Sequence, residues 1–345
     1  MRLLLIACLS PGTGNYATAA RIRAHVEEAG HTCELRDAAE FRSSTEVANL
    51  LSQNPPFQGA LAVHLFKAGR LLLDTRVPFG VIFGGTDVNE DVKVEQKRVV
   101  MEQVLQRARF AVAFSDRLKE ASETFLRSQS SKIYVQPQGV QTEAAEEFCW
   151  NDFLSSSGLA GPRRDELRVF LLVCGLRRVK DPLYLVEAFS EWHQEDPLNV
   201  LIIIGPRVDP LFSVQVEAVV QRAAGVFLAR ERSRQELHAA VKRCLAVVNS
   251  SESEGMSAAI LEAMDLGVPV LARDIPGNAA IVQHELTGLL FASPQEFVQQ
   301  SRRLVSDGEL RERVARNGQR YVEEHHGLNP ERAVYQRLVD TLLRA

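Results

Sequence analysis

Residues 249–264 read NSSESEGMSAAILEAM, and they follow an apolar run that begins at Leu245. The apolar run, which ends at Asn249, is typical of a buried strand, and the polar residues after it are typical of a loop. From about Gly255, small and apolar residues recur at helical spacing and predict a helix. A strand, a loop and a helix in direct succession are the repeating unit of a parallel sheet covered by helices.

The same unit recurs along the chain, because short apolar runs alternate with segments of helical period. In the first half, strands are predicted at Leu3–Leu9, Thr32–Leu35, Gly59–His64, Val77–Phe83, Phe110–Phe114 and Lys132–Val135. In the second half, they are predicted at Val169–Cys174, Val200–Ile204, Val226–Leu228, Leu245–Asn249, Val268–Ala272 and Leu289–Phe291. This alternation predicts an α/β fold of two Rossmann-like domains in tandem.

A polar segment separates the two series of strands. Between residues 141 and 165 the periodicity fades into Glu, Ser, Gly, Pro and Arg, which is typical of an inter-domain linker. We therefore expect an N-terminal domain over residues 1–150, a linker over 141–165 and a C-terminal domain over 166–329. The tail at 330–345 has the spacing of an amphipathic helix, which can pack back on the N-terminal domain.

The composition excludes several classes of protein. The chain has 345 residues and a net charge of −4, and this mild acidic excess argues against a general nucleic-acid binder. No apolar run approaches the roughly 20 residues that span a bilayer, so no integral membrane segment is expected. The five cysteines lack C-x-x-C spacing, so neither a metal site nor a disulfide framework is predicted. We expect a cytoplasmic protein; secretion is the alternative if residues 1–9 act as a signal.

The first strand leads into a glycine turn. Residues 12–17 read GTGNYA, which fits G-x-G-x-x-[G/A], and Glu34 and Asp37 follow about where a dinucleotide fold places its ribose-binding acid. This pattern alone suggests an NAD(P)-dependent oxidoreductase. However, such a turn exposes main-chain N–H groups that can face any phosphate, so the broader prediction is a ligand-facing loop. The predicted ligand contacts are Gly12, Thr13, Gly14 and Asn15.

Two carboxylates flank the start of the helix predicted from about residue 255. Eight residues of helix rise roughly 12 Å, more than the roughly 5–9.5 Å between the paired carboxylates of glycosidases. The spacing of Glu254 and Glu262 therefore suits an extended ligand, such as a sugar–diphosphate–ribose with hydroxyls at both ends. A central phosphate would meet the helix N-terminus, whose main-chain N–H groups attract anions. The N–H groups concerned belong to Gly255, Met256 and Ser257.

Cations that suit a diphosphate follow another predicted strand, in the loop Gly175–Lys180. Ligands bind at the carboxyl ends of strands in open α/β sheets. Arg177 or Arg178 could hold a diphosphate through two parallel hydrogen bonds, and Lys180 adds a point charge. A basic surface loop is the alternative interpretation of the same residues.

These motifs resemble one known family. The E-x7-E segment, GVPV at 267–270 and TGLL at 287–290 closely resemble the retaining glycosyltransferases of family 4, which have the GT-B fold. In the N-terminal half, His64, GGTDVN at 84–89 and PQGV at 137–140 are similar to the same family. The resemblance implies two Rossmann-like domains facing across a cleft. It also implies transfer of a sugar from a nucleoside diphosphate donor, by family habit a UDP-sugar, with retention at the anomeric carbon.

The resemblance further implies roles for individual residues. It assigns Glu254 to hydroxyls of the donor sugar and Glu262 to the ribose. It assigns Lys180, a nearby arginine and the main-chain amides of Gly255–Ser257 to the diphosphate. The segment Gly12–Asn15 is expected near the reacting centre.

The sequence departs from the family pattern at one point. The family usually has Arg directly after Gly in a G-R-L triplet, whereas residues 174–176 read Cys-Gly-Leu. Either Arg177 or Arg178 replaces the missing arginine, or the leaving group is stabilised less. His64 is expected to contact the donor sugar or the acceptor, with a structural histidine at a strand end as the alternative. The predicted catalytic residues are Glu254, Lys180, Arg177 and His64, and Arg178 is grouped with the donor-binding residues.

No D-x-D motif occurs, so we expect a metal-independent enzyme without a cofactor. Its expected partners are a nucleotide-sugar donor and an acceptor that is a small molecule, a glycan or a protein. Asp87 and Asn89 are candidates either for acceptor contact or for forming a turn. Two other functions stay open. One is a catalytically silent nucleotide-sugar-binding or interaction protein, and the other is the oxidoreductase, which explains only the first glycine turn.

Overall fold

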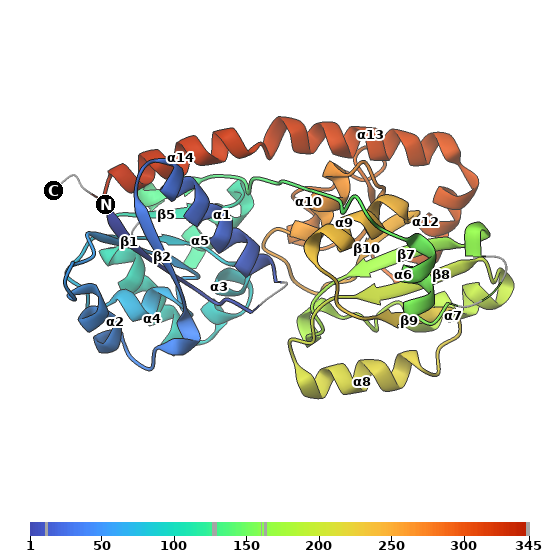
Figure 1. The fold of residues 1–345 in the computed structure, drawn as a ribbon, viewed down its shortest axis with the longest axis horizontal. Coiled ribbons are helices and arrows are strands. Elements are labelled where there is room, and N and C mark those ends of the chain that lie inside the picture. The colour runs from blue at the N-terminus through green and yellow to red at the C-terminus, as the bar shows by residue number, and fades with distance from the viewer. Residues whose placement is uncertain (11–12, 126–129, 160, 162–163, 343–345) are drawn as a thin grey trace. The chain divides into compact units, whose positions relative to one another are not determined.

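A computed structural model describes residues 1–10, 13–125, 130–159, 161 and 164–342 of the chain. The chain divides into two compact units, which are described separately. Unit 1 comprises Met1–Gly139 together with His326–Ala345, and unit 2 comprises Val140–His325. The chain therefore leaves unit 1 once and returns to it near its C-terminus (Figure 1).

Unit 1 is built on a parallel sheet with the strand order β2-β1-β3-β4-β5-β6. Its strands are β1 (Arg2–Ala7), β2 (Thr32–Asp37), β3 (Gly59–Val63), β4 (Phe79–Ile82), β5 (Phe110–Ala113) and β6 (Ile133–Val135). All residues of β3, β4 and β5 are buried, as expected for strands covered on both faces. The chain order reverses between β1 and β3, and such a switch point is where open α/β sheets bind ligands.

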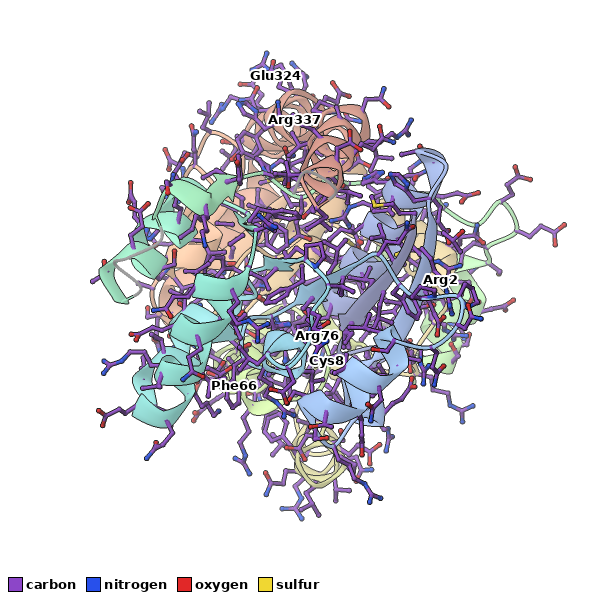
Figure 2. The ribbon with its side chains drawn as sticks, turned by 90° about the vertical axis from the view of Figure 1, so that its left-hand side faces the viewer. Arg2, Cys8, Phe66, Arg76, Glu324 and Arg337 are labelled. Atoms are coloured by element: carbon purple, nitrogen blue, oxygen red, sulfur yellow. The ribbon has the colours of Figure 1, made fainter. Side chains whose placement is uncertain are left out.

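The helices of unit 1 follow from capping and apolar spacing. The first begins after Thr13, whose hydroxyl accepts a hydrogen bond from the N–H of Tyr16, and it buries Ala19, Ile22 and Val26. The α-helices are α1 (Gly14–Glu28), α2 (Ser44–Leu51), α3 (Gly85–Asn89), α4 (Glu95–Arg107), α5 (Asp116–Phe125) and α14 (Leu328–Asp340). The last of these packs on α1, so the C-terminal helix belongs to this unit; Figure 2 labels Arg337 on it.

Unit 2 has a second parallel sheet, in the order β12-β11-β10-β7-β8-β9. Its strands are β7 (Arg168–Val173), β8 (Asn199–Ile204), β9 (Val226–Ala229), β10 (Ala246–Asn249), β11 (Val270–Arg273) and β12 (Leu289–Phe291). The chain runs outward from β7 to β9 and then crosses to β10 on the other side of β7. The switch point of unit 2 therefore lies between β7 and β10.

Helices cover both faces of this sheet. They are α6 (Trp150–Ser156), α7 (Val186–Glu195), α8 (Pro210–Val220), α9 (Arg234–Arg243), α10 (Ala258–Asp265), α11 (Pro276–Ala279), α12 (Pro294–Ser306) and α13 (Gly308–His325). Because successive side chains of a strand point to opposite faces, Val169 and Leu171 join one apolar cluster and Phe170 and Leu172 join the other. The buried strands are thereby anchored in two cores, one on each side of the sheet.

The twelve predicted strands all form, with ends that differ from the predicted ends by at most two residues. The segment 141–165, which was expected to be a linker, lies within unit 2, because that unit already begins at Val140. Within that segment α6 buries Phe153 and Leu154 against the core. Its described residues therefore belong to the fold of unit 2 rather than to a separate linker. None of the described helices is long and apolar enough to cross a membrane.

Candidate active site

The switch point of unit 2 brings together residues that are far apart in the sequence. The parallel strands β7 and β10 are hydrogen-bonded neighbours, so their carboxyl ends lie side by side. Lys180 follows β7 in the 3-10 helix η6 (Arg178–Lys180), and Glu254 follows β10 in a loop. These two predicted residues meet, although 74 positions separate them.

One oxygen of Glu254 is the centre of a hydrogen-bonded cluster. Its Oε1 accepts hydrogen bonds from Lys180 Nζ at 2.5 Å, from Ser251 Oγ at 2.8 Å and from Asn249 Nδ2 at 3.2 Å. The side chains of Glu254 and Lys180 are only 8% and 17% exposed. A largely buried carboxylate that is held in this way keeps one orientation, because every donor would have to move with it.

The cluster also determines the charge of Glu254. Burial alone would raise the pKa of the Glu254 carboxyl. The nearby Lys180 ammonium and the hydrogen bonds from Lys180, Ser251 and Asn249 outweigh burial and hold that pKa below its usual range. Glu254 is therefore an ionised hydrogen-bond acceptor at neutral pH.

Hydrogen bonds from both side-chain and main-chain groups hold the loops after β7 and β10 against each other. The hydroxyl of Ser250 lies 3.0 Å from the carbonyl oxygen of Lys180 and 2.9 Å from that of Asp181, and the N–H of Glu252 donates to Val179 O at 3.0 Å. Arg273, at the end of β11, adds a contact of 3.1 Å from its Nη1 to Asp181 Oδ2. The position of Lys180 is thus set by its backbone as well as by its ion pair.

Two residues that the sequence analysis did not single out lie close to Glu254 or to its partner Asn249. Asn278 is fully buried, and its Nδ2 donates to Asn249 Oδ1 at 3.0 Å. Gly277 lies so close to Glu254 that an added Cβ would be 2.2 Å from the Glu254 carbonyl oxygen. Only glycine fits at that distance. The signal in the sequence was a Pro-Gly pair after a strand, which alone predicts no more than a turn.

The helix after Glu254 begins later than predicted. It starts at Ala258 with Ser257 as its N-cap residue, whereas Gly255 and Met256 belong to the loop. The roughly 12 Å expected from eight helical residues therefore does not apply between Glu254 and Glu262. Among the described residues, no hydrogen bond is formed by the main-chain N–H groups of Gly255, Met256 and Ser257. These groups remain available to an anion, as do those of the first turn of α10.

Glu262 has a separate set of partners. Its Oε1 accepts a hydrogen bond from Arg234 Nη2 at 2.8 Å, and its Oε2 lies 3.4 Å from His238 Nε2. Burial would raise the pKa of the Glu262 carboxyl, but His238 and Arg234 hold it below its usual range. Lys180, Ser251 and Asn249 bond Glu254, whereas Arg234 and His238 contact Glu262, so the two carboxylates are held by different side chains.

The two adjacent arginines face different surroundings. The exposed Arg178 donates from Nη2 to Gln215 Oε1 at 3.3 Å, and its guanidinium lies 5.2 Å from the centre of the Phe212 ring, so α8 holds it. Arg177 is partly buried and, within the described part of the chain, forms no ion pair. Burial raises the pKa of the Cys174 thiol, and the charges of Lys180 and Arg177 both oppose that rise.

The remaining predicted residues lie in unit 1. Gly12 falls outside the described residues. Thr13 caps α1, whose first residues are Gly14 and Asn15. His64 directly follows β3 and is 3% exposed, and burial lowers its pKa although Asp87 opposes the shift. The structure assigns Asp87 to forming the turn, because its carboxylate accepts main-chain hydrogen bonds from Leu65, Phe66 and Gly84.

The described residues bring together no group of three or more His, Cys, Asp or Glu side chains that could hold a metal ion.

Comparisons relate this architecture to known proteins. The family model "Glycosyl transferases group 1" matches residues 160–321. "Glycosyltransferase 1 domain-containing protein 1" of Xenopus tropicalis is 52% identical over 339 residues, which cover 98% of this chain and 97% of that protein.

The solved structures of two other proteins resemble this chain over its whole length. HepE of Anabaena, in complex with UDP-glucose, has a TM-score of 0.77 at 16% identity and 100% coverage of both chains. Sucrose-phosphate synthase of Thermosynechococcus elongatus has a TM-score of 0.74 at 16% identity, with 100% of this chain and 99% of that chain covered. These likenesses and the two six-stranded parallel sheets confirm the predicted GT-B fold class.

Proposed function

The chain belongs to the group 1 glycosyltransferases, and from this premise we propose that it transfers a sugar from a UDP-sugar to an acceptor with retention and without a metal ion. The family accounts for motifs in both halves of the chain. An oxidoreductase would leave the whole cluster around Glu254 without a role.

The observation that carries the proposal is the Lys180–Glu254 pair at the switch point of unit 2. Without a ligand the two charges neutralise each other at 2.5 Å. A bound donor offers both of them a partner, because its diphosphate is an anion for Lys180 and its sugar hydroxyls are donors for Glu254. The cost of burying each charge is then offset by the ligand, which favours binding of a molecule that carries both groups.

Departure of the diphosphate makes up most of the barrier in such a transfer. Negative charge grows on the oxygen that leaves, so fixed cations and main-chain N–H groups close to it lower the barrier. We assign this role to Lys180, Arg177 and the N–H groups of Gly255–Ser257. In many enzymes of phosphate chemistry a divalent ion stabilises the same charge, and these groups of the chain would take its place.

The other end of the donor is assigned to Glu262. An ionised carboxylate accepts hydrogen bonds from two neighbouring hydroxyls, and a ribose presents such a pair. Arg234 and His238 keep Glu262 charged and oriented. The HepE structure contains UDP-glucose, which supports a uridine nucleotide as the first donor to try.

Two affinities distinguish the roles of the glutamates. With Glu262→Gln, calorimetric titration should show both UDP and UDP-glucose weakened at least about tenfold, since each loses a charged hydrogen bond. With Glu254→Gln, UDP-glucose should weaken while UDP stays within about twofold. Glu187→Gln, at an exposed glutamate on α7, is the matched control and should change neither affinity. Unchanged affinities in both site variants would refute the proposed donor site.

Retention is tested on the product. Proton NMR of the sugar released from, or transferred out of, an α-linked UDP-sugar should show the α-anomer first. A β-anomer formed first would refute retention, although not the donor site. Tight donor binding with no turnover, even by hydrolysis, would instead support the catalytically silent alternative.

A further inference from the structure

Unit 1 has its own switch point, between β1 and β3. In the parallel register Ile6 pairs with Ala62, so Cys8 and His64 come to the same edge two residues further on. Open α/β sheets bind ligands at this edge. Figure 2 labels Cys8 and, in the turn after β3, Phe66. The donor site proposed in unit 2 uses other residues, whereas His64 at this edge is expected to contact the donor sugar or the acceptor.

The turn after β3 is held rigidly. His64 has φ +76°, a left-handed conformation that only a few non-glycine residues adopt. The carboxylate of Asp87 accepts the N–H of Leu65 at 2.9 Å and that of Phe66 at 3.1 Å, and the N–H of Gly69 donates to His64 O at 2.9 Å. Because a strained residue is held by several hydrogen bonds, the side chains that follow His64 in this turn start from a fixed main chain.

The turn presents two cations, Lys67 and Arg70. Both are partly buried, and among the described residues neither forms an ion pair or a side-chain hydrogen bond. The guanidinium of Arg70 lies 6.0 Å from the centre of the Phe66 ring, a contact that leaves its N–H groups unused. Lys97 shows the contrast, since its Nζ is paired with Asp91 Oδ1 at 2.6 Å.

Within the described residues, the carboxylates near the two cations form no ion pair with them. Burial raises the pKa of the Cys8 thiol; Lys67 and Arg70 oppose that rise, and Asp37 and Asp87 add to it, so all four charges act at this edge. The Asp37 carboxylate, however, caps the N–H of Ala39 at 3.0 Å, and that of Asp87 is engaged by main-chain N–H groups. The hydrogen-bond donors of Lys67 and Arg70 are therefore not used by these two carboxylates, whose negative charges nevertheless act at the same edge.

The imidazole of His64, which precedes these cations in the turn, also has a ring nitrogen without a hydrogen-bond partner among the described residues. That nitrogen is Nδ1, and His64 is 3% exposed. A Cβ added to Gly84 would lie 2.0 Å from His64 Nε2, so Gly84 allows the ring to occupy this place. A buried polar atom without a partner is costly unless a ligand or water completes it.

We propose that Lys67 and Arg70 bind an anionic group of the acceptor, a phosphate or a carboxylate. This proposal rests on the proposed function, because it assumes that unit 2 binds the donor. Unit 1 would then bind the anionic group of the acceptor. Arg70 supplies a planar pair of donors that matches two oxygens of such a group, and Lys67 adds a compact charge. The enzyme would thus favour acidic acceptors over neutral ones.

The test uses the full chain saturated with UDP, so that the donor's diphosphate site is occupied. Inorganic phosphate and, separately, acetate are titrated while the unfolding temperature is followed, with sodium chloride at equal ionic strength as the reference. A saturable rise is expected with at least one anion, and which anion gives it distinguishes phosphate from carboxylate acceptors. Lys67→Gln and Arg70→Gln should each weaken the apparent affinity at least about tenfold. Lys93→Gln, at an exposed lysine of the same unit, should not.

Two results would overturn the proposal: no saturable response of the wild-type chain to either anion, or a response that both variants keep. A UDP titration of the same variants separates this failure from failure of the proposed function. If UDP binds normally while the anion response is absent, only the acceptor proposal fails. If the wild-type chain does not bind UDP, the proposed function itself fails.

Discussion

Arg177 and Arg178 are neighbours in the sequence, yet their surroundings differ. Arg178 is held by Gln215 and Phe212 on α8, whereas the charge of Arg177, like that of Lys180, opposes the rise in the pKa of the Cys174 thiol. A hydrogen bond to a charged group contributes about 1.5–3 kcal/mol, which corresponds to about 10- to 150-fold in affinity. We expect Arg177→Gln to weaken UDP binding by at least about tenfold and Arg178→Gln by less than about twofold. Calorimetric titration measures both, and the opposite order would show that Arg178 replaces the family's missing arginine.

Gly277 gives a second prediction for a single residue. Gly277→Ala places a methyl group 2.2 Å from the Glu254 carbonyl oxygen, so the loop that carries Glu254 must shift. Because a displacement of about 1 Å can reduce a rate about 100-fold, donor turnover should fall by between ten- and a hundredfold. The control is Gly308→Ala, where the nearest atom is 3.7 Å from the added Cβ. Circular dichroism should show both variants folded; unchanged turnover in Gly277→Ala would separate Glu254 from the chemistry.

Residue spacing predicted only part of the candidate site. The E-x7-E pattern and the basic loop singled out the charged residues Glu254, Glu262 and Lys180. Their supporting residues could not be predicted. Ser251, Asn249 and Gly277 are ordinary in sequence, and their role depends on how loops after different strands approach one another.

At the scale of elements, the start of α10 shows the limit of pattern reading. Apolar spacing predicted a helix from about Gly255, but it begins at Ala258. Asn249 explains the difference, because its Nδ2 bonds both Glu254 Oε1 and Ser257 Oγ and so holds the loop open. A side-chain contact from the preceding strand, which has no periodic signature, sets the boundary.

The contact of α14 with α1 depends on a buried ion cluster. Glu331 is fully buried; its Oε2 lies 2.7 Å from Arg21 Nε and 2.8 Å from His25 Nε2. Breaking a buried pair by removing one partner costs about 3–5 kcal/mol, and the partly exposed Arg21 favours the lower end of that range. Glu331→Gln should therefore lower the free energy of unfolding by about 3 kcal/mol in a urea titration. Glu27→Gln, which breaks the exposed Arg23–Glu27 pair, should cost less than about 1 kcal/mol. Equal costs would mean that the cluster does not anchor α14.

The same cluster predicts a dependence on pH. Burial would raise the pKa of Glu331, but His25, Arg21 and the N–H of Gly139 hold it below the ordinary value of 4.5. A lowered pKa stabilises the folded state fully above the unfolded pKa, and this stabilisation is lost as the pH falls through the folded pKa. The difference in stability between wild type and Glu331→Gln should thus be constant near neutral pH and shrink below about pH 4.5. A difference that grows on acidification would contradict this assignment.

At the scale of the whole molecule, hydrophobic patterning predicted the fold well. Buried parallel strands are continuous apolar runs, so each of the twelve stood out between polar turns. The segment before β7 was misread, because the Ser- and Gly-rich residues around α6 hide the two side chains, Phe153 and Leu154, that join the core. Short elements are defined by what they pack against, and a sequence read alone does not contain that information.

We propose that the donor binds at the edge of the unit 2 sheet between β7 and β10. Hydrogen–deuterium exchange of the full chain with and without saturating UDP tests it most directly, because main-chain N–H groups that bind a diphosphate exchange more slowly. We predict slower exchange in residues 176–181 and 255–262, and none of that protection in the chain carrying both Lys180→Gln and Glu262→Gln. Saturating UDP that leaves these two segments unprotected, while slowing exchange elsewhere, would contradict the account.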